Sequence, residues 1–170
     1  MRVVLGVVVV VLAAAALSVG AMAATLTPVQ FAAKPGWHVG VGKLHACPGV
    51  AATKCARVTS WASTVRWRDC VDCLPHRTVA TLPATGVAIQ VSLIRESPAV
   101  AKEALAWPPQ VRAADLVSPF EGLPSRIGVY QRFARMGAYE VYILVLFGRS
   151  RPDGRQLAAA NAELRSAKLP

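Results

Sequence analysis

All four cysteines, Cys47, Cys55, Cys70 and Cys73, lie within residues 44–77. Cysteines can form structural disulfides, act as a redox pair or bind a metal. An even number of cysteines in an exported chain favours two disulfides, because thiols are kept oxidised outside the cytoplasm. The sequence leaves open whether the pairing is local (Cys47 with Cys55, Cys70 with Cys73) or joins the two pairs crosswise.

The second cysteine pair has the C-x-x-C spacing, in which one thiolate attacks a disulfide and the other resolves it. Redox sites of this kind need a following helix whose N-terminus lowers the thiol pKa. Pro75 is compatible with a helix start, but residues 77–84 contain Thr, Val and Pro and are a poor helix. Leu74, where a c-type haem site would need His, excludes haem attachment. The motif therefore favours a structural disulfide over a redox site.

Zinc binding is the other chemistry that this segment could support. Cys70, Cys73 and His76 could ligate one zinc ion together. The candidates for a fourth ligand are Cys47, Cys55 and His45. Zinc ligands usually come as two close pairs, and the spacing of Cys47 and Cys55 makes a poor one. We therefore expect no metal or other cofactor, with zinc at Cys70, Cys73 and His76 as the alternative.

The sequence contains no motif of a known hydrolase or nucleotide-binding enzyme. G-x-S-x-G, H-E-x-x-H, S-x-x-K and the P-loop are all absent. His38, His45 and His76 could act as general bases, with Asp69 or Asp72 to orient one of them. Any chain of this size offers such combinations, so we assign no catalytic residue.

The N-terminus is typical of a signal peptide. Arg2 supplies a positive charge, residues 3–19 form an uncharged apolar run, and small residues at Ala21 and Ala23 follow. These two alanines occupy the −3 and −1 positions of a cleavage site after Ala23. A retained membrane anchor is the alternative, but no basic stop-transfer cluster follows, and the next basic residue is Lys34. No cysteine follows the alanines, which argues against a lipid-anchored lipoprotein.

The composition is strongly basic, and 14 of the 19 basic residues are arginine. A GC-rich bacterial coding sequence would enrich Arg and Ala without a functional reason. Attraction to a polyanion, such as a cell-wall polymer, an anionic membrane or nucleic acid, is the functional alternative. Because the basic residues are dispersed, we favour the compositional explanation. A nucleic-acid module would show aromatic residues interleaved with basic ones on one face. Trp61, Arg66, Trp67 and Arg68 are the single stretch of this kind, so we expect no specific nucleic-acid partner.

Residues 24–170 have the length of one domain, preceded by the signal peptide 1–23. Apolar alternation and β-branched residues predict strands. These strands cover residues 37–42, 57–67, 85–94, 127–133 and 139–147. Alternation within 57–67 would place Trp61 and Trp67 on one face of a strand. Arg135-Met136-Gly137-Ala138 joins the last two strands in an antiparallel hairpin.

Two helices are expected between and after these strands. Ser97-Pro98 resembles a helix start and predicts a short helix that ends at Ala106. The following stretch, 111–125, is expected to be a structured loop. Asp153 and Gln156 resemble a capping box, followed by an apolar stripe that predicts a helix to Lys168.

The strand over 139–147 is apolar at nearly every position, which is typical of a central strand covered on both faces. Glu140 near its start is expected at the sheet margin. The predicted fold is therefore α+β, with a mainly antiparallel sheet of four to six strands and the C-terminal helix packed across it.

The order of elements over residues 86–168, together with Pro35-Gly36-Trp37, resembles exported PsbP-like domains. That resemblance implies an α/β sandwich used for binding and assembly rather than catalysis. The cysteine segment 44–77 departs from the family, and the resemblance assigns no functional residue.

The sequence thus predicts a secreted or cell-surface binding module without catalytic activity. Its partner would be an anionic surface polymer or another cell-envelope protein, and it would meet the membrane only through an uncleaved leader. A thiol- or zinc-dependent enzyme centred on the C-x-x-C segment is the alternative.

Overall fold

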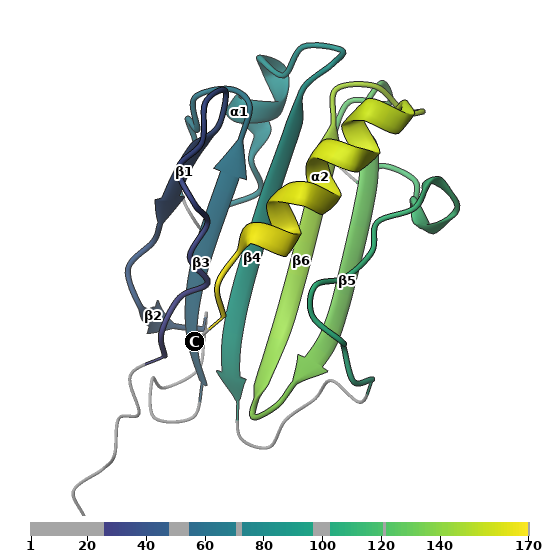
Figure 1. The fold of residues 1–170 in the computed structure, drawn as a ribbon. Coiled ribbons are helices and arrows are strands. Elements are labelled where there is room, and N and C mark those ends of the chain that lie inside the picture. Colours follow the sequence, from purple (N-terminus) through teal and green to yellow (C-terminus); the bar gives the residue numbers. More distant parts are fainter. Residues whose placement is uncertain (1–25, 48–54, 71–72, 97–102, 121, 170) are drawn as a thin grey trace, which may run out of the picture.

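A six-stranded antiparallel sheet forms the centre of the molecule (Figure 1). The computed structural model describes residues 26–47, 55–70, 73–96, 103–120 and 122–169. The strands are β1 (His38–Val41), β2 (His45–Ala46), β3 (Cys55–Ser63), β4 (Val87–Glu96), β5 (Gly128–Met136) and β6 (Tyr139–Phe147). They are arranged in the order β1-β3-β4-β6-β5, with β2 also paired to β3. The helices are α1 (His76–Ala80) and α2 (Gly154–Ser166), and a 3₁₀ turn covers Ala113–Asp115. The predicted α+β fold is confirmed.

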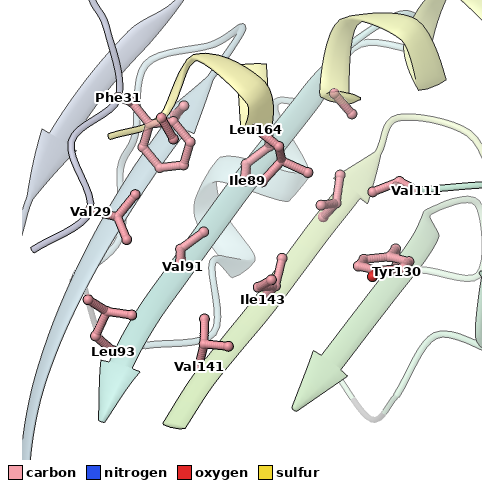
Figure 2. Packing of buried hydrophobic residues seen from close by; sticks show 14 of the residues in the cluster. Val29, Phe31, Ile89, Val91, Leu93, Val111, Tyr130, Val141, Ile143 and Leu164 are labelled. Carbon is pink, nitrogen blue, oxygen red and sulfur yellow. The ribbon is translucent and has the colours of Figure 1, made fainter. Parts of the chain in front are cut away.

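One face of the sheet, the α2 face, carries the larger hydrophobic core. Every second residue of β4 and β6 points to this side, as the alternation of Ile89, Val91 and Leu93 predicts (Figure 2). Leu164 of α2 packs into the same core and is fully buried. The apolar stripe of α2 therefore lies across the sheet and excludes water from this face.

The opposite face, the α1 face, has a smaller core and more polar residues. Val79 of α1 and Leu82 pack against Leu144 and Leu146 of β6. Farther along the strands, the Thr59 and Ser92 hydroxyls lie 2.7 Å apart in a buried hydrogen bond. The polar residues Gln90 and Ser92 of β4 therefore lie on this face, although their side chains are buried.

Strand β6 lies between β4 and β5 and is covered on both faces, as its nearly continuous apolar sequence predicts. Its hairpin with β5 has two turn residues between Met136 and Tyr139. Gly137 is the first of them and has φ of 59°, a conformation that glycine adopts without strain.

The two ends of the described chain are held together beside α2. Gln30 and Lys168 exchange two backbone hydrogen bonds of 2.9 Å, which keep Val29 in the α2-face core. Lys34 donates a 3.0 Å bond to the buried carboxylate of Glu163, so that this charge is paired. Within the described ranges, no helix has the length and apolar character needed to cross a membrane.

The predicted helix over residues 97–106 is wrong for its described residues, 103–106. Residues 97–102 lie outside the described residues, and residues 103–106 are not helical. Instead, the Leu105 N–H donates to the carbonyl of Arg135, whose own N–H donates to Glu103. These bonds cover part of the outer edge of β5, and pairing with the sheet edge replaces the locally favoured helix.

Two further expectations need correction. Glu140 is buried, with 1% of its surface exposed, rather than lying at the sheet margin. β3 ends at Ser63, so Trp61 and Trp67 do not share a strand. The chain turns after Ser63 and brings Trp67 back, so that the two rings stack with centroids 5.1 Å apart.

The capping box of α2 is confirmed. The Asp153 carboxylate accepts a 2.9 Å bond from the Gln156 N–H, and the Gln156 side chain accepts one of 3.2 Å from the Asp153 N–H. Gln156 also donates to the carbonyls of Ala84 and Gly86, which fixes the start of α2 to the turn before β4. The sequence pattern thus marks the helix start, and the structure adds that the same glutamine attaches α2 to the sheet.

Acid should weaken this cap. The hydrogen bond from the Gln156 N–H, helped by Arg149, lowers the pKa of Asp153 from 3.8. Because the folded pKa is the lower one, the contribution of the cap is complete above pH 3.8 and is lost as the pH falls through the folded pKa. In urea unfolding between about pH 2 and pH 6, wild type should lose stability more steeply than Asp153→Asn, whose neutral amide still caps. Parallel curves would contradict this account.

Candidate functional site

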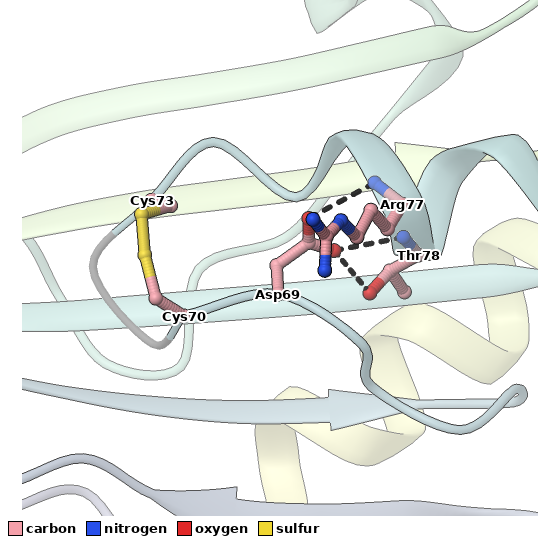
Figure 3. The surroundings of a disulfide bond; sticks show 5 residues. All are labelled: Asp69, Cys70, Cys73, Arg77 and Thr78. Carbon is pink, nitrogen blue, oxygen red and sulfur yellow. Dashed lines mark hydrogen bonds between the residues drawn. A yellow bond between two sulfur atoms is a disulfide. The ribbon is translucent and has the colours of Figure 1, made fainter.

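The segment between β3 and β4 contains the C-x-x-C motif and is organised around the Asp69 carboxylate (Figure 3). Its Oδ1 accepts a 2.9 Å bond from the Arg77 N–H, and its Oδ2 accepts bonds of 2.7 and 2.6 Å from the N–H and hydroxyl of Thr78. Asp69 therefore caps the N-terminus of α1 from outside the helix. A negative charge at this position also interacts favourably with the helix dipole.

Arg126 performs the matching role at the other end of α1. Its Nη2 donates to the carbonyls of Val79 (3.1 Å) and Ala80 (3.5 Å). Its Nη1 donates to Leu82 (3.2 Å) and to Gly148 at the end of β6 (3.3 Å). One guanidinium thus binds carbonyl groups at the C-terminal end of α1, where the Val79 carbonyl also accepts from the Leu82 N–H, and it joins α1 to the sheet.

The cysteines form two local pairs, Cys47 with Cys55 and Cys70 with Cys73, with Cα–Cα distances of 5.5 and 5.2 Å. This settles the pairing that the sequence left open, in favour of the local alternative. Two disulfides also indicate an oxidising environment.

Cys70, Cys73 and His76 line one hollow of about 350 Å³, the disulfide hollow. Its other lining residues are Arg68, Asp69, Leu74 and Arg77. The three residues proposed for thiol or zinc chemistry are therefore brought together. The two sulfurs are bonded to each other, and within the described ranges no group of three or more His, Cys, Asp or Glu residues could hold a metal ion.

The candidates for a fourth zinc ligand lie far away. Cys55 begins β3 and Ser63 ends it, and nine strand residues span roughly 26 Å. Cys47 and His45 lie at the Cys55 end, where β2 pairs with β3, whereas Cys70 follows Ser63. Cys47, Cys55 and His45 therefore do not lie beside Cys70, Cys73 and His76, so the zinc alternative lacks the fourth ligand that the sequence offered for it.

The helix expected after a redox C-x-x-C is present but small. α1 begins three residues after Cys73 and has five residues. The N–H groups of Arg77 and Thr78, which have no acceptor within α1, donate to the Asp69 carboxylate. They are not available to stabilise a thiolate, and the nearby negative charge opposes its formation.

The histidines are separated from one another. His76 donates from Nδ1 to the Gly122 carbonyl at 2.9 Å. Asp69 is occupied by α1 rather than by His76, and Asp72 lies outside the described residues. His38 and His45 belong to β1 and β2, so no histidine–carboxylate pair forms among these residues. Ala21 and Ala23 also lie outside the described residues.

Arginines gather where β3 and β6 end and β4 and β5 begin; we call this region the arginine end. It has seven of the 13 described arginines: Arg66, Arg68, Arg77, Arg126, Arg149, Arg151 and Arg155. Two described carboxylates there, Asp69 and Asp153, accept helix N–H groups, and a third, Asp115 beside the start of β5, is paired with Arg112. Asp72 and Glu121 lie outside the described residues; even if both are counted here, seven positive charges face five negative ones.

Sequence reasoning missed α1 and the roles of Asp69 and Arg126. Arg126 bonds residues 22 to 47 positions away, and no local pattern marks such contacts. The dispersed arginines become a cluster through the topology, which brings three segments to one end of the sheet: the β3–β4 connection, the loop before β5, and the β6–α2 connection with the first turn of α2.

No family model, curated protein or solved structure matches this chain. The resemblance to PsbP-like domains therefore stays a prediction. Function has to be inferred from the residues of the arginine end.

Removing the Asp69 carboxylate should destabilise α1. Asp69→Ala is expected to lower the free energy of unfolding by about 1–2 kcal/mol, because two backbone N–H groups lose their acceptor. Asp115→Ala is the control, since it breaks the exposed ion pair with Arg112 and should cost less than about 0.5 kcal/mol. Urea unfolding measures both. An equal cost for the two variants would show that Asp69 does not support the fold.

Proposed function

We propose that this chain is an exported, non-enzymatic binding module whose arginine end binds an anionic polymer of the bacterial cell envelope. The observation that carries the proposal is the gathering of seven arginines at one end of the sheet. A GC-rich coding sequence accounts for the number of arginines but gives no reason for their location. Their placement therefore favours attraction to a polyanion over the compositional explanation that the dispersed sequence positions favoured.

The chemistry of the arginine end suits a ligand with repeated carboxylates or phosphates. A guanidinium presents a planar fork of donors that matches these groups. Arg66, Arg68, Arg77, Arg151 and Arg155 are exposed. Two neighbouring carboxylates are already bonded to helix N–H groups, so they compete less for these guanidinium groups.

Export is supported by the apolar leader with its small residues at Ala21 and Ala23, and by the two disulfides. An extracytoplasmic protein meets the charged polymers of the cell envelope directly. Binding to such a polymer would depend on ionic strength, because exposed charges are screened within about 10 Å at 0.1 M salt.

Removing two arginines from this end should weaken polymer binding. Arg66→Gln/Arg68→Gln is expected to lower the affinity for polyglutamate and for polyphosphate about three- to tenfold at low salt. The matched control, Arg135→Gln/Arg165→Gln, removes the same charge from exposed sites outside the arginine end and should change the affinity less than twofold. Equal losses for both variants, or binding that does not respond to salt, would overturn the proposal.

The second candidate function is a thiol- or zinc-dependent enzyme. The observation in its favour is that Cys70, Cys73 and His76 all line the disulfide hollow. The binding module predicts no free thiol and no bound metal in protein exported by a bacterial host. Two reactive thiols, or about one zinc ion per chain, would support the enzyme instead. Thiol titration in denaturant with metal analysis distinguishes them, with Cys70→Ser/Cys73→Ser as the control for assigning any thiol found.

A further inference from the structure

A second hollow, of about 490 Å³, opens at the β5 side of the arginine end. Two loops and Ile127, the residue before β5, form its wall. It is lined by Ala113, Leu116, Val117, Ser118, Pro119, Ile127, Ser150, Arg151 and Pro152. We call it the Arg151 hollow. Its volume lies within the range of about 300–1,000 Å³ that small-ligand sites occupy.

Most of its wall is apolar and well anchored. Ile127 is fully buried, whereas Val117 is 44% exposed and is among the few large hydrophobic side chains left open to solvent. The Val117 N–H donates a 2.8 Å bond to the Val129 carbonyl, which fixes this loop to β5. The hollow therefore offers a preformed apolar surface that remains in contact with water.

The polar side chains that line the hollow make no hydrogen bond or ion pair with the described residues. These side chains are those of Arg151, Ser118 and Ser150. The neighbouring Arg149, by contrast, donates to the Ala84 carbonyl and faces Asp153 at 3.6 Å. A guanidinium and two hydroxyl groups are thus free to bind a ligand beside an apolar wall.

We infer that the Arg151 hollow binds a small amphipathic anion, with a carboxylate or phosphate headgroup on Arg151 and an apolar tail against Val117 and Leu116. An arginine pairs such a headgroup through two parallel hydrogen bonds, and the serine hydroxyl groups can donate to its remaining oxygens. The apolar tail removes exposed hydrophobic surface from water. This site does not depend on polymer binding, since a single headgroup occupies it.

Calorimetry with dodecanoate, below its micelle concentration, tests the inference on the full mature chain. Dodecanoate should bind at one site, whereas acetate and dodecanol, which each lack one half of the ligand, should bind at least tenfold more weakly. Arg151→Gln should weaken dodecanoate binding about tenfold, because a charged hydrogen bond is replaced by a neutral one. Val117→Asp should abolish it, since the new carboxylate repels the headgroup and interrupts the apolar wall.

Two controls separate this site from its alternatives. Arg165→Gln removes an exposed arginine of α2, at the other end of the helix, and should leave dodecanoate binding unchanged. Arg66→Gln/Arg68→Gln should also leave it unchanged, even if that variant loses polymer binding. Thermal unfolding of each variant shows that it remains folded.

Equal binding of dodecanol and dodecanoate, or an Arg151→Gln variant that binds like wild type, would overturn the inference. So would amide NMR shifts on dodecanoate addition that fall outside residues 113–118, 127, 150 and 151. Shifts confined to these residues and abolished in Val117→Asp would establish the site.

Discussion

The arginine end depends on how a helix of five residues is held in place. An isolated helix of this length does not form in water, because nucleation costs more than so few hydrogen bonds return. α1 persists because Asp69 binds its N-terminus and Arg126 binds its C-terminal carbonyls. Val79 then lies fully buried against the sheet and covers part of the α1 face. One carboxylate and one guanidinium thus position the layer that closes the second core.

The same interactions shape the electrostatics of the surface. Folding uses Asp69 and Asp153 as caps, and it uses the guanidinium groups of Arg126 and Arg149 to bind backbone carbonyls. The arginines that remain, such as Arg151, have no structural bond and face solvent. Folding therefore engages the carboxylates of Asp69 and Asp153 and leaves several guanidinium groups of the same end exposed.

The elements that could be predicted from sequence are those with a local cause. Alternation in β4, the continuous apolar run of β6 and the capping box at Asp153 each depend on residues within one element. Prediction failed where residues distant in the sequence determine the local structure. Residues 103–106 are an example, because Glu103 and Leu105 form hydrogen bonds with Arg135 instead of forming a helix. α1 was missed for the same reason, since its two stabilising partners lie outside it. The cysteine pairing could not be chosen because both alternatives satisfied the spacing.

Which side chains make hydrogen bonds within the fold also matters for catalysis. General acid–base chemistry needs a titratable group near a partner that orients it. Asp69, the described carboxylate in the disulfide hollow, is bonded to the α1 backbone, and His76 is held through Nδ1 by a carbonyl. The described groups left free at the arginine end include guanidinium groups and the hydroxyl groups of Ser118 and Ser150, which bind anions. These free groups are the ones that the proposed binding of a negatively charged ligand would use.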